Sequence, residues 1–185
     1  MGSTVVHLTA GDPSPATLAL VAGVALAKAV SALAPGPGFT LKWPNDLLID
    51  GAKCAGILLE RTGNSVVIGI GVNLVTAPEL PDRPTAALAD RGATLDRDRF
   101  ADVLGIAMID AIWTWRQEGI GSIIRAWLPL GHPVGTPLRV SEQQIDGVFD
   151  GLADDGALRL RRADGAIMLV HAGDVELNRP PQEGM

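Results

Sequence analysis

The stretch KWPNDLLIDGAKCAGILLE, residues 42–60, decides the fold of this chain. Its centre, Asp50-Gly51, lies between two apolar runs and predicts a tight β-hairpin. Lys42 and Asp46 stand near the end of the strand that leads into this hairpin, and Lys53 begins the return strand. Because a strand fixes the direction of its side chains, these charged groups can be held stiffly around a small anionic ligand.

A second strand, which carries two glycines, follows the hairpin. Residues 65–74 are apolar almost throughout, as is typical of a strand in the middle of a sheet. Gly69 and Gly71 are two residues apart and open the same face, on which Asn73 is the next residue. Glycine weakens a strand, so this spacing indicates a ligand or a close neighbour. Gly56 on the hairpin likewise lets a ligand approach the backbone.

The remaining elements complete an α+β fold. The pattern predicts a short strand at residues 3–8 and helices at residues 14–33, 96–118 and 121–128. We expect these helices to pack on a mixed sheet that contains the hairpin.

The pattern of the sequence changes after residue 129, from long helical segments to short β-like runs. Four Asp-Gly pairs separate short β-like runs, which predicts four or five strands in a small β-barrel. We expect a larger domain at residues 1–130, the barrel at residues 131–178 and a polar tail at residues 179–185.

Size and composition limit the class of protein. The 185 residues are 47% hydrophobic, which suits a folded core, and the net charge of -6 argues against nucleic-acid binding. The single cysteine, Cys54, excludes an internal disulfide and suits a reducing cytoplasm. Residues 1–12 do not resemble a signal peptide. The apolar segment 16–34 contains Lys28, so we expect a buried helix there and no membrane span.

The polar residues around the hairpin suit one kind of chemistry. A lysine supplies a positive charge for a carboxylate or phosphate, and Asp and Asn supply oxygen ligands for magnesium. Together they suit the activation of a carboxylate by a nucleotide, in which phosphoryl charge must be neutralised. Each residue alone also has a structural explanation: Lys42 and Lys53 as solvated lysines, Gly69 and Gly71 as a bulge or a site of tight helix packing.

Three motifs in order resemble the catalytic domain of the biotin protein ligases. They are Lys-Trp-Pro-Asn-Asp at residues 42–46, Lys-x-Ala-Gly-Ile-Leu-x-Glu at residues 53–60 and Ile-Gly-x-Gly-x-Asn at residues 68–73. The β-rich region that follows resembles the small SH3-like C-terminal domain of that family. The resemblance covers nearly the whole chain, from residue 3 to about residue 177.

The resemblance implies a role for each matching residue. Lys53 would hold the biotin carboxylate and then the adenylate phosphate, and the loop at residues 75–88 would fold over the adenylate. Lys42 would support Lys53 as a second catalytic lysine. The other roles follow the motifs: Gly56, Ile57 and Gly69 for biotin; Lys42, Asn45 and Asn73 for the nucleotide phosphates; Asp46 and Asn73 for Mg²⁺.

The implied activity is that of an ATP-dependent biotin–protein ligase. Biotin and MgATP would give biotinyl-adenylate, and a lysine of a biotin carboxyl carrier protein or domain would then accept the biotin. One alternative is a non-catalytic binding or assembly module, in which a free sheet edge could pair two copies into a homodimer. A weaker alternative is a ligase for lipoate or octanoate.

The Gly/Arg-rich loop that the family carries upstream has no counterpart in this sequence. In the family this loop precedes the strand that begins here at Ser3 and contributes to biotin and phosphate binding. The resemblance therefore implies an N-terminally incomplete catalytic domain. We expect pyrophosphate release by this 185-residue chain to be far below that of a family member.

Other reactive or bulky residues receive structural interpretations. Cys54 lies beside Lys53, which could lower its thiol pKa, but no partner for covalent chemistry is suggested and we expect it to pack in the core. Trp113, Trp115 and Trp127 are expected to be anchors in the core or at the domain junction.

Overall fold

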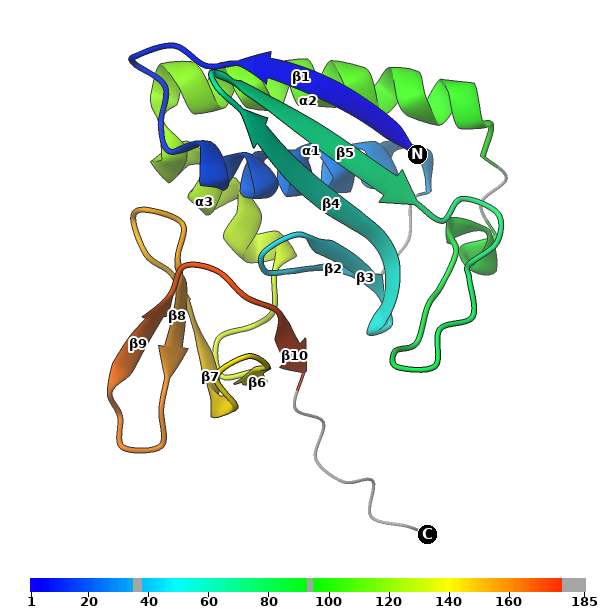
Figure 1. Ribbon diagram of the computed structural model, residues 1–185. Helices are drawn as coiled ribbons and strands as arrows, with labels where there is room; N and C mark the ends of the chain where they lie inside the picture. The colour runs from blue at the N-terminus through cyan, green and yellow to red at the C-terminus, as the bar shows by residue number, and fades with distance from the viewer. Residues whose placement is uncertain (35–37, 93–94, 178–185) are drawn as a thin grey trace, which may run out of the picture.

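The computed structural model describes residues 1–34, 38–92 and 95–177. In these residues the chain forms two antiparallel sheets and a layer of helices (Figure 1). The predicted polar tail at residues 179–185 lies outside the described residues.

The first sheet has five strands in the order β1-β5-β4-β3-β2. The Asp50-Gly51 turn joins β3 to β4 as the sequence predicts, and both residues have positive φ angles. The strands are β1 (Gly2–His7), β2 (Phe39–Lys42), β3 (Asp46–Ile49), β4 (Ala52–Thr62) and β5 (Ser65–Val72).

The prediction of a mixed sheet is wrong. Every pair of named strands in the first sheet is antiparallel. Short turns join β2 to β3, β3 to β4 and β4 to β5, and a short turn can connect only antiparallel neighbours. Among the described residues, parallel pairing is limited to isolated bridges, Leu41 with Gly131 and Lys53 with Thr85.

Helices cover one face of this sheet. α1 (Leu18–Leu33) follows a short 3₁₀ turn at Pro15–Thr17 and packs on β2 to β5, while α2 (Arg97–Glu118) and α3 (Ile120–Trp127) pack on α1. The segment Pro15–Leu33 is long and apolar enough to cross a membrane, yet 72% of it is buried inside the protein. This is the buried helix that the sequence predicts. It needs cover on several sides because it is apolar nearly all round.

The ends of α2 follow its sequence signals. The Asp96 carboxylate accepts a hydrogen bond from the backbone N–H of Arg99 at 2.8 Å, as an N-cap does.

Trp115 and Trp127 are fully buried, but Trp113 is 58% exposed, so the prediction that Trp113 is an anchor is wrong. Residues two positions apart in an α-helix point in directions about 200° apart. The burial of Trp115 therefore turns Trp113 outward.

The second sheet also has five strands, in the order β10-β6-β7-β8-β9. All its pairs are antiparallel. The number of strands agrees with the prediction, but the edge strands β9 and β10 do not pair with each other in the described residues, so closure into a barrel is not seen there. The strands are β6 (Pro137–Val140), β7 (Ile145–Leu152), β8 (Leu158–Arg161), β9 (Ile167–Val170) and β10 (Val175–Leu177).

Two tryptophans hold the second sheet against the rest of the protein. The rings of Trp127 and Phe149 are tilted at 53° with their centroids 6.4 Å apart. The indole N–H of Trp43 donates to the carbonyl of Gly156, in the turn between β7 and β8, at 3.1 Å. This docking brings β10 beside β2 and β3, where the candidate site lies (Figure 1).

Candidate functional site

A β-bulge sets the position of Lys53 on the hairpin. Leu47 faces Ala55, but the next residue, Leu48, faces Lys53, so Cys54 is an extra residue in β4. Bulges often re-aim a side chain next to a functional site. The loop after β5 also fixes the backbone here: the Lys53 N–H donates to the carbonyl of Pro84 at 2.9 Å, and its carbonyl accepts from the Ala86 N–H at 3.0 Å.

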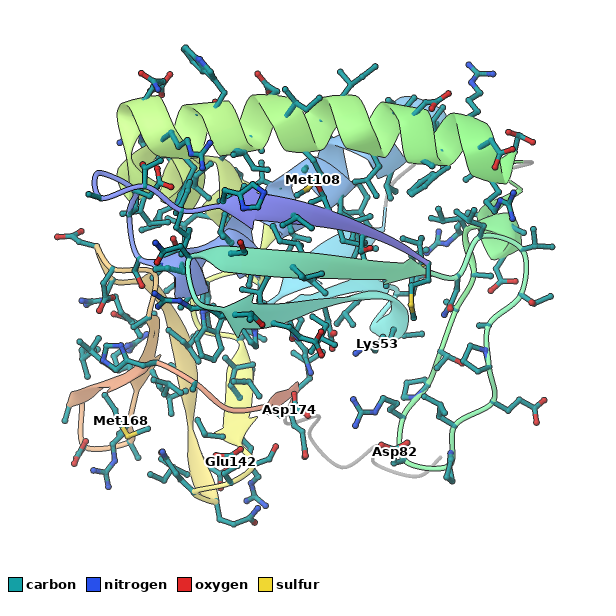
Figure 2. All side chains as sticks on the ribbon, turned by 45° about the horizontal axis from the view of Figure 1, so that its top comes forward. Lys53, Asp82, Met108, Glu142, Met168 and Asp174 are labelled. Atoms are coloured by element: carbon teal, nitrogen blue, oxygen red, sulfur yellow. The ribbon has the colours of Figure 1, made fainter. Side chains whose placement is uncertain are left out.

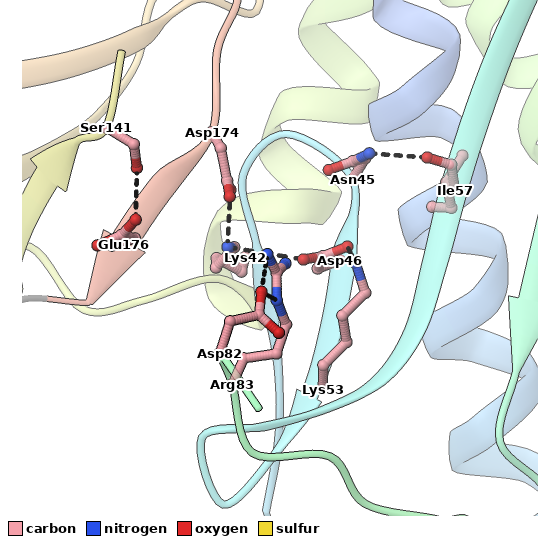
Figure 3. A network of polar contacts seen from close by, with 10 residues as sticks. All are labelled: Lys42, Asn45, Asp46, Lys53, Ile57, Asp82, Arg83, Ser141, Asp174 and Glu176. Atoms are coloured by element: carbon pink, nitrogen blue, oxygen red, sulfur yellow. Dashed lines mark hydrogen bonds and ion pairs between the residues drawn. The ribbon is translucent and has the colours of Figure 1, made fainter. Parts of the chain in front are cut away.

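Asp46 is the centre of a cluster of charged groups (Figure 3). Its Oδ1 is 2.6 Å from Lys53 Nζ, and its Oδ2 is 3.6 Å from Lys42 Nζ. Lys42 Nζ is also 3.1 Å from Oδ1 of Asp174, which precedes β10. The Asp46 side chain is only 4% exposed. Oδ1 is buried, and its contact with the Lys53 ammonium group is an ion pair.

This cluster forms one wall of a cavity of about 360 Å³, which we call the charged cavity. Asp82 and Arg83, in the loop after β5, form a 2.8 Å ion pair at its edge. The pKa of Arg83 is raised, mainly by its hydrogen bond with Asp82 and further by the charges of Asp174 and Asp46. The ionisable residues that line the cavity are Lys42, Lys53 and Arg83 against Asp46, Asp82, Asp174 and Glu176.

A second cavity, of about 540 Å³, lies on the sheet face opposite the helices and is called the glycine cavity here. Gly56, Gly69 and Gly71 line it, together with apolar side chains such as Leu58 and Leu80. A Cβ added at Gly71 would meet no atom within 4 Å, so a side chain there would occupy open space. The sequence prediction that the β5 glycines open one common face agrees with this arrangement.

Gly56 has a different local role. A Cβ at Gly56 would lie 3.2 Å from both Cε and Nζ of Lys53 and 3.5 Å from Oδ1 of Asp46. Distances near 3.2 Å are tighter than ordinary van der Waals contact, so a side chain at Gly56 would displace the lysine. This glycine thus permits Lys53 to reach Asp46.

Lys53 lines both cavities. Its side chain is 30% exposed, so its ammonium group is accessible to a ligand. A molecule with an apolar body and one carboxylate can lie along the glycines with its carboxylate at Lys53, while phosphate groups occupy the charged cavity. The arrangement suits a reaction that joins a carboxylate to a phosphate.

The asparagines lie near the site but hold the backbone. Asn73 Nδ2 donates to the carbonyls of Ala86 at 3.1 Å and Lys53 at 3.4 Å. Asn45 Nδ2 donates to the carbonyl of Ile57 at 2.7 Å. Ile57 lines the glycine cavity, although its side chain is 3% exposed and belongs to the core. The predicted roles of Asn45 and Asn73 in binding the nucleotide, and of Ile57 in binding biotin, remain predictions.

The structure does not bring the two predicted magnesium ligands into one cavity. Asp46 lines the charged cavity, whereas Asn73 lines the glycine cavity. No cluster of three or more His, Cys, Asp or Glu side chains suited to a metal occurs among the described residues. A cation here would therefore need oxygen ligands from a nucleotide as well as from Asp46.

Four residues of the charged cavity were missed by the sequence reasoning. Asp82 and Arg83 lie in a loop with no periodic pattern, and Asp174 and Glu176 lie about 130 residues after Lys42. Asp82 and Arg83 lie in the loop at residues 75–88 that the resemblance places over the adenylate, but the sequence does not single out either residue within it.

Cys54 is a buried thiol whose Sγ donates to the carbonyl of Asn73 at 3.7 Å. Burial raises its pKa to about 11, and the nearby charge of Asp90 adds to this effect. The suggestion that Lys53 lowers this pKa is wrong, because desolvation of the thiolate dominates. The prediction that Cys54 packs in the core is confirmed by its complete burial.

Comparisons with known proteins identify the family of the chain. Residues 7–74 match the Biotin/lipoate A/B protein ligase family, and residues 137–178 match the Biotin protein ligase C terminal domain. A biotin--[acetyl-CoA-carboxylase] ligase of Paracoccus denitrificans is 35% identical over 180 residues, with 89% of this chain and 74% of the relative covered. A ligase of the same name from Mycobacterium tuberculosis is 37% identical over 174 residues, with 85% of this chain and 61% of the relative covered.

The fold is also found in a solved structure. A biotin protein ligase from Aquifex aeolicus, in complex with biotin and ATP, superposes with a TM-score of 0.82 at 22% identity. The match covers 96% of this chain and 77% of that protein.

Proposed function

The chain belongs to the biotin protein ligase family, and from that premise we propose that it is an ATP-dependent biotin–protein ligase. Its reaction joins biotin to a lysine of a biotin carboxyl carrier protein or domain, in the cytoplasm. The observation that carries this proposal is the position of Lys53, on the boundary between the glycine cavity and the charged cavity.

In the first step, a biotin carboxylate oxygen attacks the α-phosphorus of ATP. A new P–O bond forms, the bond to the β-phosphate breaks, and pyrophosphate leaves with the electron pair. The ammonium group of Lys53 pairs with the carboxylate before the attack and with the adenylate phosphate after it. This positive charge stabilises the negative charge that develops at the phosphorus. Lys42 supplies a second positive charge to the same cavity.

In the second step, the neutral amine of the carrier lysine attacks the acyl carbon of biotinyl-adenylate. An amide C–N bond forms, the C–O bond to phosphate breaks, and AMP leaves as a phosphate anion. The amine loses one proton to solvent or to a nearby base. Lys53 stays beside the leaving phosphate and balances its charge.

Magnesium fits the charged cavity as a companion of the nucleotide. Oδ1 of Asp46 is buried and contacts the Lys53 ammonium group at 2.6 Å, so a cation that replaced this contact would gain a hard oxygen ligand. Mg²⁺ is commonly bound by one or two carboxylates and by the phosphates of the nucleotide. Bound there, the cation would neutralise phosphate charge and release Lys53 from its contact with Asp46.

A comparison of Lys53→Gln with the unmodified chain tests the proposal. Binding of biotin and of a non-hydrolysable biotinyl-adenylate analogue is measured by calorimetry, and biotin-dependent pyrophosphate release by a coupled assay. We expect Lys53→Gln to lower kcat/KM by about 10²–10³-fold, the loss typical of one charged stabilising group. Lys28→Gln is the matched control, because Lys28 pairs with Asp110 on the helical layer and lines neither cavity.

Three outcomes would contradict the proposal. The first is that the chain binds neither biotin nor the analogue. The second is that Lys53→Gln and Lys28→Gln behave alike. The third is that lipoate or octanoate supports pyrophosphate release better than biotin. Binding without any transfer to a carrier domain would instead support a non-catalytic module.

A further inference from the structure

The backbone ties Arg83 to Lys53, although the two residues are far apart in the sequence. Just after Arg83, the carbonyl of Pro84 accepts from the Lys53 N–H at 2.9 Å, and Thr85 forms a parallel bridge with Lys53. Pro84 also favours an extended backbone at Arg83, since a residue before proline avoids the helical region. The Arg83 side chain therefore starts from a fixed point beside the strand that carries Lys53.

The guanidinium of Arg83 lies close to the acidic residues of the charged cavity. Besides its hydrogen bond with Asp82, the charges of Asp174 and Asp46 help to raise its pKa. Figure 3 shows the Arg83 side chain extending from its loop toward the contact between Lys42 and Asp46. A positive group in this position can reach an anion that fills the cavity.

The lining of the charged cavity suits phosphates better than an adenine ring. Seven of the eleven residues that line it are ionisable, and three of these are cations. Bases are usually held by apolar and aromatic side chains, whereas phosphates are held by lysine, arginine and Mg²⁺. The charged cavity is therefore the place for the phosphates of a nucleotide.

The direction of the reaction places the two cavities on opposite sides of the α-phosphorus. In an in-line displacement at phosphorus, the attacking and leaving oxygens lie on opposite sides. Lys53 lines both cavities, so it lies where the carboxylate and the α-phosphate meet. A carboxylate that attacks from the glycine cavity thus sends pyrophosphate into the charged cavity. Arg83 lines the charged cavity and not the glycine cavity, so it lies on the side of the leaving group.

Arg83 can exchange its carboxylate partner for a phosphate. Asp82 is 57% exposed and lies near the outer end of its loop (Figure 2), and exposed ion pairs add little to stability. A guanidinium can bind phosphate through two parallel hydrogen bonds, which is a stronger contact. Lys42 is held more firmly, since its side chain is only 11% exposed and contacts two carboxylates. Turning Asp82 outward would also remove one of the four carboxylates that line the cavity.

We propose that Arg83 binds the β- and γ-phosphates of ATP and then the leaving pyrophosphate, in exchange for Asp82. This inference rests on the proposed function and adds a substrate-binding residue to it. As the bond from the α-phosphorus to the bridging oxygen breaks, negative charge gathers on the pyrophosphate, and the guanidinium stabilises it. Arg83 stays protonated throughout and transfers no proton. Lys53 keeps the α-phosphate, so the two cations hold different parts of the nucleotide.

Binding of inorganic pyrophosphate with Mg²⁺, measured by calorimetry, tests this assignment without biotin. We expect Arg83→Gln to raise the Kd for pyrophosphate about tenfold or more, the loss typical of a charge-assisted pair. Arg83→Lys should recover part of the affinity, since lysine keeps the charge but not the planar fork. Arg97→Gln is the matched control, because Arg97 also pairs with the next residue, Asp98, at 2.9 Å but lines neither cavity. Thermal unfolding checks that each variant is folded.

Kinetics and analogue binding separate the role of Arg83 from that of Lys53. Arg83→Gln should raise the KM for ATP about tenfold or more. It should leave the Kd for a non-hydrolysable biotinyl-adenylate analogue within about twofold, because that analogue has no β- or γ-phosphate. An equal loss of affinity for pyrophosphate and for the analogue would place Arg83 at the α-phosphate and overturn the assignment.

Asp82→Asn should have the opposite effect to Arg83→Gln. It frees the guanidinium from a competing carboxylate, so we expect pyrophosphate to bind about two- to fivefold more tightly. The gain should vanish when Arg83→Gln is added. Weaker binding by Asp82→Asn would show that Asp82 holds Arg83 in place, and would overturn the exchange.

Two further results would overturn the role of Arg83. One is that the unmodified chain does not bind pyrophosphate, and the other is that Arg83→Gln and Arg97→Gln bind it equally well. A failure of the ligase function looks different, because the chain would then bind neither biotin nor the adenylate analogue. Pyrophosphate binding through Arg83 in such a chain would support the phosphate site and contradict the ligase function alone.

Discussion

Three neighbouring residues set the position of the Lys53 side chain. The extra residue Cys54 shifts the pairing of β4, Gly56 leaves room for the lysine stem, and Asp46 lies 2.6 Å from its ammonium group. The sequence identifies the lysine and the glycine by their spacing. It does not indicate the bulge, because a bulge depends on how two strands align.

The thiol of Cys54 should be almost unreactive in the folded protein. Its pKa is raised to about 11 by burial, so roughly one thiol in a thousand is ionised at pH 8. Labelling with a disulfide reagent should be slow, should rise about tenfold per pH unit between pH 8 and 10, and should become fast in denaturant. Rapid labelling of the folded chain at pH 8 would show that the site opens or that the thiol is activated.

Gly71→Val should block the glycine cavity without harming the fold. The new side chain enters open space, and valine favours β-strands, so stability should be unchanged or slightly higher. We expect the Kd for biotin to rise at least about tenfold while the affinity for ATP changes little. Calorimetry with each ligand separately measures this, and Gly121→Ala on α3 serves as the control. An unchanged biotin affinity would place biotin elsewhere.

At the scale of elements, the turn between β2 and β3 connects the two sheets. Lys42 and Asp46, which flank this turn, face the charged cavity, while Trp43 between them is buried and reaches back to Gly156. One short segment therefore holds the site and the docked second sheet together. The sequence marks residues 42–46 as a motif. The contact between Trp43 and Gly156 forms only when the second sheet docks against the first.

Trp43→Phe should separate the indole hydrogen bond from the packing of the ring. It leaves the carbonyl of Gly156 without its donor, which should lower the free energy of unfolding by about 1–2 kcal/mol. If docking of the second sheet positions the charged cavity, the KM for ATP should rise several-fold with little change in biotin affinity. Thermal unfolding and steady-state kinetics measure the two effects.

The matched control for that substitution is Trp113→Phe. Trp113 is 58% exposed, so its change should leave both stability and KM unaffected. If Trp43→Phe and Trp113→Phe had the same stability and the same KM for ATP, the Trp43 hydrogen bond would not position the charged cavity.

At the scale of the whole molecule, the charged cavity is assembled from two sheets and a loop. β2 to β4 provide Lys42, Asp46 and Lys53, the loop after β5 provides Asp82 and Arg83, and the segment around β10 provides Asp174 and Glu176 (Figure 3). The predicted division at residue 130 remains a prediction. If it is right, the charged cavity lies across that boundary, so its two parts must dock to form it.

Asp174→Asn tests this assembly. The change removes the negative charge that lies 3.1 Å from Lys42 Nζ but keeps the size of the side chain. We expect the KM for ATP to change by about 3–30-fold while the Kd for biotin stays within about twofold. Asp146→Asn, on β7 outside both cavities, is the control. A change in biotin affinity alone would show that Asp174 does not belong to the nucleotide part of the site.

The sequence by itself determined the hairpin, the faces of its glycines, the capped helix α2 and the family. These features depend on local rules: a turn pair, the two-residue period of a strand and the preferences of a helix end. Only the tertiary structure decided the antiparallel pairing throughout the first sheet, the exposure of Trp113 and the raised pKa of Cys54. It also brought Asp174 to Lys42, across 132 positions of sequence. Such contacts depend on how apolar faces pack, and packing is not encoded in any short stretch of the chain.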